Sequence, residues 1–215
     1  GTNNIDSNSR LCMSSAVAGY KMTLGADAPP ACYEDIAHAQ CLFIAGSNAA
    51  WAHPILFRRI EDAKRANPAL KMVVVDPRRT DTADMADLHL AIQPGTDVML
   101  FHGLLHIMLA QGWTDNAYIA AHTEGFEALQ TLVQAYTPAS VAQTCGLPEA
   151  DLYTAARWLA GVPDGTAPGQ AFQRQRSLTQ GGPLLVGLLG NSRCVVVSNV
   201  RIKEVTSIKE FSRCF

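Results

Sequence analysis

The sequence lacks several features that mark common classes of protein. Among its 215 residues no apolar run is long enough to cross a membrane, and no basic start followed by an apolar stretch marks a secretion signal. The net charge of −2 gives no reason to expect a nucleic-acid or membrane partner. The motifs G-x-S-x-G and G-x-x-x-x-G-K, typical of acyl hydrolases and P-loop proteins, are absent.

The cysteines also lack the spacing of a metal or disulfide framework. They occupy positions 12, 32, 41, 145, 194 and 214. No pair forms C-x-x-C, the spacing of zinc and iron–sulfur sites, and the irregular distribution does not indicate disulfides. We therefore expect a reducing compartment, the cytoplasm. The chain begins without Met and its first residues read as mid-domain, so we expect a fragment of a longer protein.

The apolar pattern predicts an α/β fold, a Rossmann-like parallel sheet with flanking helices. Continuous apolar runs at 41–45 and 71–75 indicate strands buried on both faces. A helix is expected between them, over 54–67, and a third strand at 87–92. The apolar positions expected on one face of that helix are Ile55, Leu56, Ile60 and Ala63.

The second half of the chain predicts helices and then a change of composition. An almost wholly apolar helix is expected at 98–111 and should be buried. Further helices are expected at 115–122 and 125–136, from a start at Thr137-Pro138, and from Pro148 to about Leu159. We expect a cofactor-binding α/β region over 1–160 and a divergent or non-native tail over 161–215, in which 184–198 forms two strands.

Polar residues follow the first two predicted strands, where an open α/β sheet binds ligands. Gly46, Ser47 and Asn48 leave the first strand, and their N–H groups and hydroxyl suit a pyrophosphate. An ordinary strand-to-helix loop is the alternative. Asp76 leaves the second strand, where nucleotide-binding folds keep an acidic residue for ribose or base. The segment Asp76-Pro77-Arg78-Arg79-Thr80 also carries two arginines, either of which could pair with phosphate or lie solvated at the surface.

Cys12 is the candidate for metal chemistry. Ser9 could cap a helix that starts near Leu11, and the first turn of that helix would favour a thiolate at Cys12. A small buried hydrophobic residue is the alternative. His102 and His106 are spaced four residues apart on an apolar helix, so we expect them in the core or an interface rather than on a metal.

The segment Asn-Ile-Asp-Ser-Asn-Ser-Arg-Leu-Cys-Met-Ser-Ser at 4–15 resembles the molybdenum-binding segment of prokaryotic nitrate reductases. These enzymes belong to the dimethyl-sulfoxide-reductase superfamily, and the likeness is greatest to the assimilatory, cytoplasmic type. Three further family motifs follow in order: 46–48, 76–80 and Pro94-Gly95-Thr96-Asp97. The resemblance runs from about residue 2 to about residue 160.

This resemblance implies a cofactor, a reaction and a set of site residues. Cys12 would bind the molybdenum of a bis(molybdopterin guanine dinucleotide) cofactor, beside Met13 and Arg10, with Asn8 touching the pterin. The segments 45–52, 76–80 and 95–97 would hold the dinucleotide, with Asp97 accepting from guanine or simply carrying charge at a helix start. The reaction would be reduction of nitrate to nitrite, with electrons from an unknown donor protein. A 4Fe-4S cluster would be bound by cysteines that this chain does not contain.

Two alternatives stay open. Formate dehydrogenases of the same superfamily carry His after the metal ligand, so Met13 favours nitrate reductase without deciding against formate dehydrogenase or another molybdopterin oxidoreductase. The chain could instead be a nucleotide-binding α/β module without catalysis of its own. We expect the isolated 215 residues to be inactive.

Overall fold

The computed structural model describes residues 1–7, 14, 17–19, 21–22, 25–26, 33–163 and 165, together with the strands at 184–189 and 193–198. The candidate residues Asn8, Arg10, Cys12 and Met13 lie outside the described residues. None of the described helices is both long and apolar enough to cross a membrane.

The centre of the fold is a three-stranded parallel sheet. The strands β1 (Cys41–Ala45), β2 (Lys71–Val75) and β3 (Leu88–Leu90) lie in the order β1-β2-β3. The predicted α/β class with a parallel sheet is confirmed. The third strand is shorter than the predicted 87–92, because the N–H of Ile92 turns back to the carbonyl of Leu90 at 2.9 Å instead of pairing with β2.

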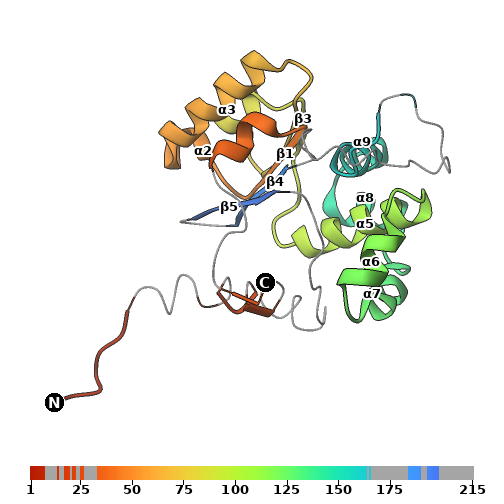
Figure 1. Ribbon diagram of the computed structural model, residues 1–215, viewed down its shortest axis with the longest axis horizontal. Coiled ribbons are helices and arrows are strands. Elements are labelled where there is room, and N and C mark those ends of the chain that lie inside the picture. Colours follow the sequence, from red (N-terminus) through yellow and green to blue (C-terminus); the bar gives the residue numbers. More distant parts are fainter. Residues whose placement is uncertain are drawn as a thin grey trace.

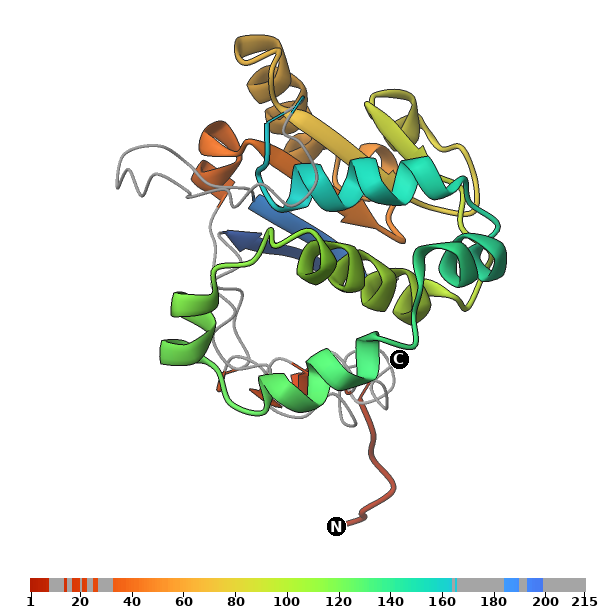
Figure 2. The same ribbon diagram turned by 90° about the vertical axis from the view of Figure 1, so that its right-hand side faces the viewer.

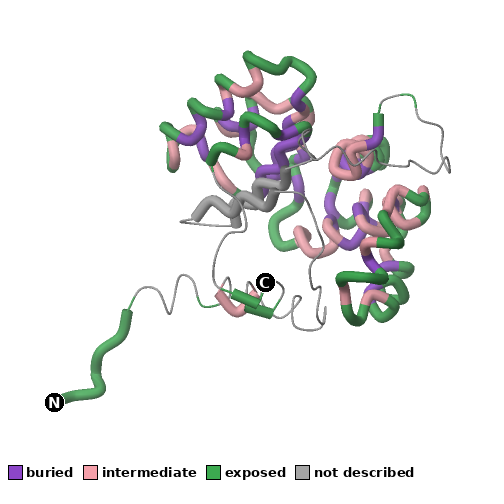
Figure 3. The backbone as a smooth tube through the Cα atoms, viewed as in Figure 1, coloured by how far each residue is buried: buried purple, intermediate pink, exposed green. Residues whose placement is uncertain are grey.

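Helices cover both faces of this sheet (Figure 1). On one face α3 (Pro54–Ala66) packs against alternate strand residues such as Ile44 and Val74. On the other face α5 (Asp97–Ala110), α8 (Pro138–Cys145) and α9 (Glu149–Leu159) enclose the intervening residues. Both faces of β1 and β2 are therefore buried, which explains their uninterrupted apolar sequences, and buried backbone concentrates at this centre (Figure 3).

One predicted core position in α3 is wrong. Ile55 is 78% exposed, whereas Leu56, Phe57 and Ile60 are buried. Successive residues of an α-helix point about 100° apart, so a run of three apolar residues leaves one of them off the buried face. Phe57, rather than Ile55, completes the apolar stripe.

The remaining helices are short. They are η1 (Tyr33–His38), α2 (Ala49–Ala52), α4 (Asp81–Asp84), α6 (Asn116–His122) and α7 (Phe126–Val133). The sequence did not predict α2, which is a single turn. The pair α6 and α7 lies away from the sheet (Figure 2), and α7 packs on α5 through Leu129 and Val133.

Two antiparallel strands follow the helices in the sequence. β4 (Leu184–Leu189) pairs with β5 (Arg193–Ser198), which confirms the two strands predicted within 184–198. The backbone of β4 runs near β1 (Figure 1). The division of the chain at residue 160 stays a prediction.

Candidate functional site

Three loops meet at the carboxyl edge of the parallel sheet. Ala45 pairs with Val75, and Val75 pairs with Leu90, so the three strands end side by side. The loops that start there are 46–48, 76–80 and 91–97. The three motifs singled out in the sequence are therefore brought to one edge, where open α/β sheets bind their ligands.

The first loop turns sharply at Gly46. Its φ of 65° is left-handed, a conformation that favours glycine, and its N–H donates to the carbonyl of Val75 at 2.8 Å. That N–H is thus used by the sheet, contrary to the expectation that it would be free for a pyrophosphate. Ser47 and Asn48 follow, half-buried. Among the residues that the structure describes, neither the Ser47 hydroxyl nor the Asn48 Nδ2 forms a hydrogen bond.

The same loop is tied to α4 by two side-chain contacts that the sequence analysis missed. Thr82 donates its hydroxyl proton to Asn48 Oδ1 at 2.9 Å and accepts the N–H of Ala50 at 3.0 Å. The indole Nε1 of Trp51 donates to Asp81 Oδ2 at 2.7 Å, although the Trp51 residue is 73% exposed. These contacts join residues 30 and 34 positions apart, and no local sequence pattern marks them.

Asp76 shapes the second loop. The residue is only 5% exposed, its Oδ1 accepts the N–H of Arg78 at 2.8 Å, and its carbonyl lies 2.9 Å from His89 Nε2. An aspartate that binds the backbone two residues on stabilises a turn. The structure therefore gives this carboxylate a role in holding the loop, with one oxygen already engaged.

The two arginines of this loop differ. Arg79 Nε donates to Asp84 Oδ1 at 2.7 Å in a pair whose side chains are 67% and 60% exposed. Within the described part of the chain, the guanidinium of Arg78 has no hydrogen-bond or ion-pair partner. Pro77 precedes it, and Thr80 accepts the N–H of Ala83 as the N-cap of α4. Arg78 is thus the arginine available to an anionic ligand.

The third loop leads into α5. Gly95 has a φ of 82°, and Thr96 occupies the N-cap position as expected. Its hydroxyl donates to the carbonyl of Gln93 at 2.8 Å instead of accepting from the helix. Asp97 is the first helical residue, half-buried, and its carboxylate has no hydrogen-bond partner among the described residues. Burial, and to a lesser degree the charge of Asp97, raises the pKa of the neighbouring Cys145 thiol.

The free groups at this edge have the hydrogen-bonding chemistry that the phosphates and the base of a nucleotide require. The hydroxyl of Ser47, the amide of Asn48 and the guanidinium of Arg78 are donors, as phosphate oxygens require. The carboxylate of Asp97 is an acceptor, as the N–H groups of a guanine base require. Sheet and helix contacts already engage groups of Gly46, Asp76, Arg79, Thr80 and Thr96.

The described residues offer no metal ligand set at this edge. No group of three or more His, Cys, Asp or Glu side chains that could hold a metal occurs among the described residues. His106 Nδ1 lies 2.9 Å from the carbonyl of Val133, and His102 is buried against Tyr136, with ring centroids 4.5 Å apart. Burial lowers the pKa of His102, which favours its neutral form. Both histidines therefore lie within the helical layer, as expected.

Comparisons with known proteins agree with this architecture. The sequence model of a family described as molybdopterin oxidoreductase matches residues 1–177. A nitrate reductase from Synechocystis sp. is 47% identical over 158 residues, covering 74% of this chain and 22% of that protein. Formate dehydrogenase H from Escherichia coli is 36% identical over 160 residues, again 74% of this chain and 22% of that protein.

A solved structure shares the fold. Acetylene hydratase from Pelobacter acetylenicus superposes with a TM-score of 0.64 and 29% identity, covering 78% of this chain and 22% of that chain. The α/β sheet with its loops at the carboxyl edge is thus the fold of a molybdopterin enzyme. The chain belongs to the molybdopterin oxidoreductase family, which uses a molybdenum–pterin cofactor, and lies within the dimethyl-sulfoxide-reductase-type superfamily. It spans 22% of the length of each of these three relatives.

Proposed function

We propose that this chain is part of a nitrate reductase that reduces nitrate to nitrite. The observation that carries the proposal is the 47% identity to a nitrate reductase over 158 residues, against 36% to a formate dehydrogenase over 160 residues. The pair Cys12-Met13 supports the same choice, because formate dehydrogenases of the superfamily typically carry His at the second position, as the resemblance implies.

The cofactor in this proposal is a bis(molybdopterin guanine dinucleotide) with molybdenum. Bound to the protein, it supplies the two-electron chemistry that amino-acid side chains lack. Ser47, Asn48 and Arg78 would bind phosphate oxygens of a dinucleotide tail, and Asp97 would accept hydrogen bonds from guanine. The turns at Gly46, Asp76 and Gly95 hold these groups at one edge. Cys12 would be the thiolate ligand of the metal, a role that rests on the resemblance of residues 4–15 alone.

The remaining parts of the proposal concern the whole protein. A 4Fe-4S cluster would be carried by a part of the protein beyond this chain, and an electron donor protein would deliver electrons to it. We propose a cytoplasmic location; the described cysteines Cys41 and Cys145 are free thiols, which suits a reducing compartment.

The test uses the full-length protein that contains this segment, as wild type and as Cys12→Ser. Metal content, nitrate reduction and formate oxidation are measured with an artificial redox dye. We expect molybdenum and nitrate turnover in the wild type, and at least a roughly hundredfold lower turnover in the variant, since a hydroxyl is a poor substitute for a soft thiolate ligand. Formate oxidation without nitrate turnover would replace the proposed substrate and keep the family.

A second candidate is a nucleotide-binding module without catalysis of its own. It is favoured by one observation: the side chains proposed to bind a dinucleotide, those of Ser47, Asn48, Arg78 and Asp97, all lie on loops at one edge of the sheet. A folded full-length protein that binds guanine nucleotides and contains no molybdenum would establish it.

A further inference from the structure

The hydroxyl of Thr82 joins two of the three loops. Thr82 is fully buried in α4, at 0% exposed. Its oxygen accepts the backbone N–H of Ala50, and its proton goes to Asn48 Oδ1, at 3.0 and 2.9 Å. A threonine hydroxyl has a single proton, so this arrangement uses it completely. The loop that leaves β1 is thereby fixed to the helix that follows the loop leaving β2.

This contact decides which end of the Asn48 amide is free. An asparagine amide has one carbonyl oxygen, an acceptor, and one NH₂ group with two donors. Thr82 occupies the oxygen, and the NH₂ group forms no hydrogen bond with the described residues. If the amide turned by half a rotation, its NH₂ group could donate to the remaining lone pair of the Thr82 oxygen, but the Thr82 proton would lose its acceptor. An unmade hydrogen bond at a buried donor costs about 1–3 kcal/mol, which disfavours that rotamer.

We propose that Thr82 is a positioning residue for the ligand site: it holds the Asn48 amide so that both N–H donors face an anionic group of the ligand, a phosphate oxygen. The inference rests on the proposed dinucleotide site. A second contact between the same segments supports it, because Trp51 Nε1 donates to Asp81 Oδ2 at 2.7 Å. Two contacts keep the first loop and α4 in one relative position, and Asn48 takes part in one of them.

The 215-residue chain and guanosine diphosphate provide the binding test. Calorimetric titration compares the wild type with Thr82→Val, which keeps the shape and removes the hydroxyl, and with Thr82→Ser, which restores it. We expect about tenfold weaker binding for Thr82→Val and at most about a twofold change for Thr82→Ser, the effect of one hydrogen bond. Thr131→Val is the matched control: it removes a hydroxyl that donates to the backbone carbonyl of Glu127 at 2.9 Å, on the distant helix α7.

A second variant covers the case in which Thr82→Val fails to fold. Asn48→Asp keeps an oxygen for the Thr82 proton but replaces both N–H donors by a charged acceptor. We expect this variant to unfold at the wild-type urea concentration and to bind guanosine diphosphate more than about tenfold more weakly, because a carboxylate repels phosphate. Wild-type affinity in either Thr82→Val or Asn48→Asp would overturn the proposal, as would equal losses in Thr82→Val and Thr82→Ser.

The NH₂ resonances of Asn48 in a ¹H–¹⁵N spectrum give a readout without ligand. They should shift and exchange faster in Thr82→Val and stay as in the wild type in Thr82→Ser and Thr131→Val. Unchanged resonances in Thr82→Val would refute the positioning role even if the chain binds the nucleotide. Conversely, the Asn48 resonances could shift in Thr82→Val while the wild type binds no guanosine diphosphate. That result would support the orientation by Thr82 and count against the proposed dinucleotide site.

Discussion

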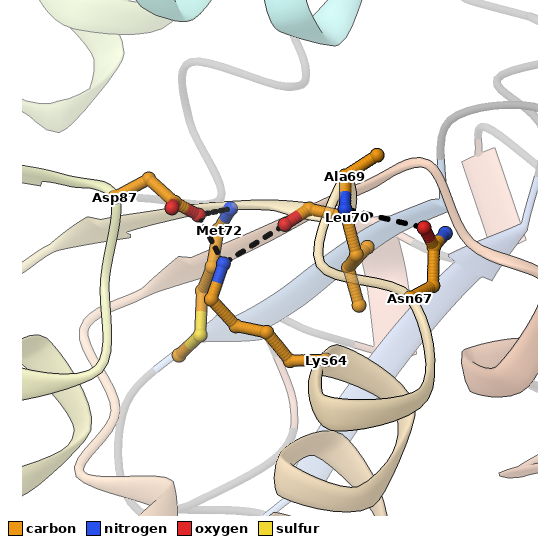
Figure 4. A network of polar contacts seen from close by, with 6 residues as sticks. All are labelled: Lys64, Asn67, Ala69, Leu70, Met72 and Asp87. Carbon is orange, nitrogen blue, oxygen red and sulfur yellow. Dashed lines mark hydrogen bonds and ion pairs between the residues drawn. The ribbon is translucent and has the colours of Figure 1, made fainter.

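The two edges of the sheet use their polar groups in opposite ways. At the amino edge, Lys64 Nζ donates to the carbonyl of Leu70 at 2.9 Å and to Asp87 Oδ2 at 2.6 Å (Figure 4). Asp87 Oδ2 also accepts the N–H of Met72 at 2.7 Å. At the carboxyl edge, Ser47, Arg78 and Asp97 carry polar groups without partners among the described residues. The contacts at the amino edge join α3, β2 and β3, whereas the unpaired groups at the carboxyl edge are available to a ligand.

This difference shows how one small sheet separates stability from function. Half-buried charges add to stability only when each is paired and hydrogen-bonded, as Lys64 and Asp87 are at 21% and 29% side-chain exposure. Polar groups kept unpaired contribute nothing to folding and are a usual property of binding sites. Substitutions of the paired groups at the amino edge should therefore change stability, and substitutions of the unpaired groups Ser47, Arg78 and Asp97 at the carboxyl edge should change binding with little effect on stability.

The largest effect is expected at the amino edge. Asp87→Ala should lower the free energy of unfolding by about 2–4 kcal/mol, because it leaves Lys64 and the N–H of Met72 without their acceptor. Urea unfolding measures the change, and guanosine diphosphate affinity should stay at the wild-type value. Asp62→Ala is the control: its pair with Arg65 is 61% and 70% exposed and is worth about 0–1 kcal/mol. Equal losses of unfolding free energy in the two variants would contradict the distinction between the half-buried pair and the exposed pair.

At the carboxyl edge, Arg78→Met should weaken guanosine diphosphate binding about tenfold or more, since a charged hydrogen bond to phosphate is lost. Its unfolding free energy should change little. The matched variant Arg79→Met removes an arginine already paired with Asp84 and should cost at most about twofold in affinity. A larger loss for Arg79→Met than for Arg78→Met would reverse the assignment of the free arginine.

The smallest effect concerns pH at the amino edge. Burial, and then the charge of Asp87, raises the pKa of the Cys41 thiol from 9.0 to about 12. The unfolded chain therefore loses this proton first, so the stabilising contribution is complete below pH 9 and is lost as the pH rises toward 12. Between pH 8 and pH 10 the wild type should lose about 1 kcal/mol more than Cys41→Ala does, measured by urea unfolding at both pH values. Identical pH dependence in the two proteins would show that Cys41 titrates normally.

Structural features could be predicted from the sequence where a single physical rule decides them. Continuous apolar runs placed β1 and β2, because short runs of about five apolar residues are typical of strands buried on both faces. Parallel strands end at the same edge, so the loops at Gly46 and Asp76, both predicted to follow strands, lie side by side. The prediction for Ile55 was wrong because a run of adjacent apolar residues does not show which of them faces the core.

Other features depend on contacts between distant segments. The N–H of Gly46 is used by β2, and this follows from the register of the sheet, which the sequence does not reveal. Thr82 was missed because a lone threonine gives no signal for a bond to a residue 34 positions earlier. Asp76 was assigned to a ligand from its place after a strand, and the structure engages one of its oxygens within its own turn.

The contact between Trp51 and Asp81 has a practical consequence. An indole that is 73% exposed and yet anchored by its Nε1 at 2.7 Å is a built-in optical probe at the carboxyl edge. The emission of an exposed indole responds to anions and aromatic bases that approach it, whereas Trp113 and Trp158 are partly shielded within the helical layer. A change in the Trp51 emission would report ligand arrival directly, without a label and without waiting for any reaction.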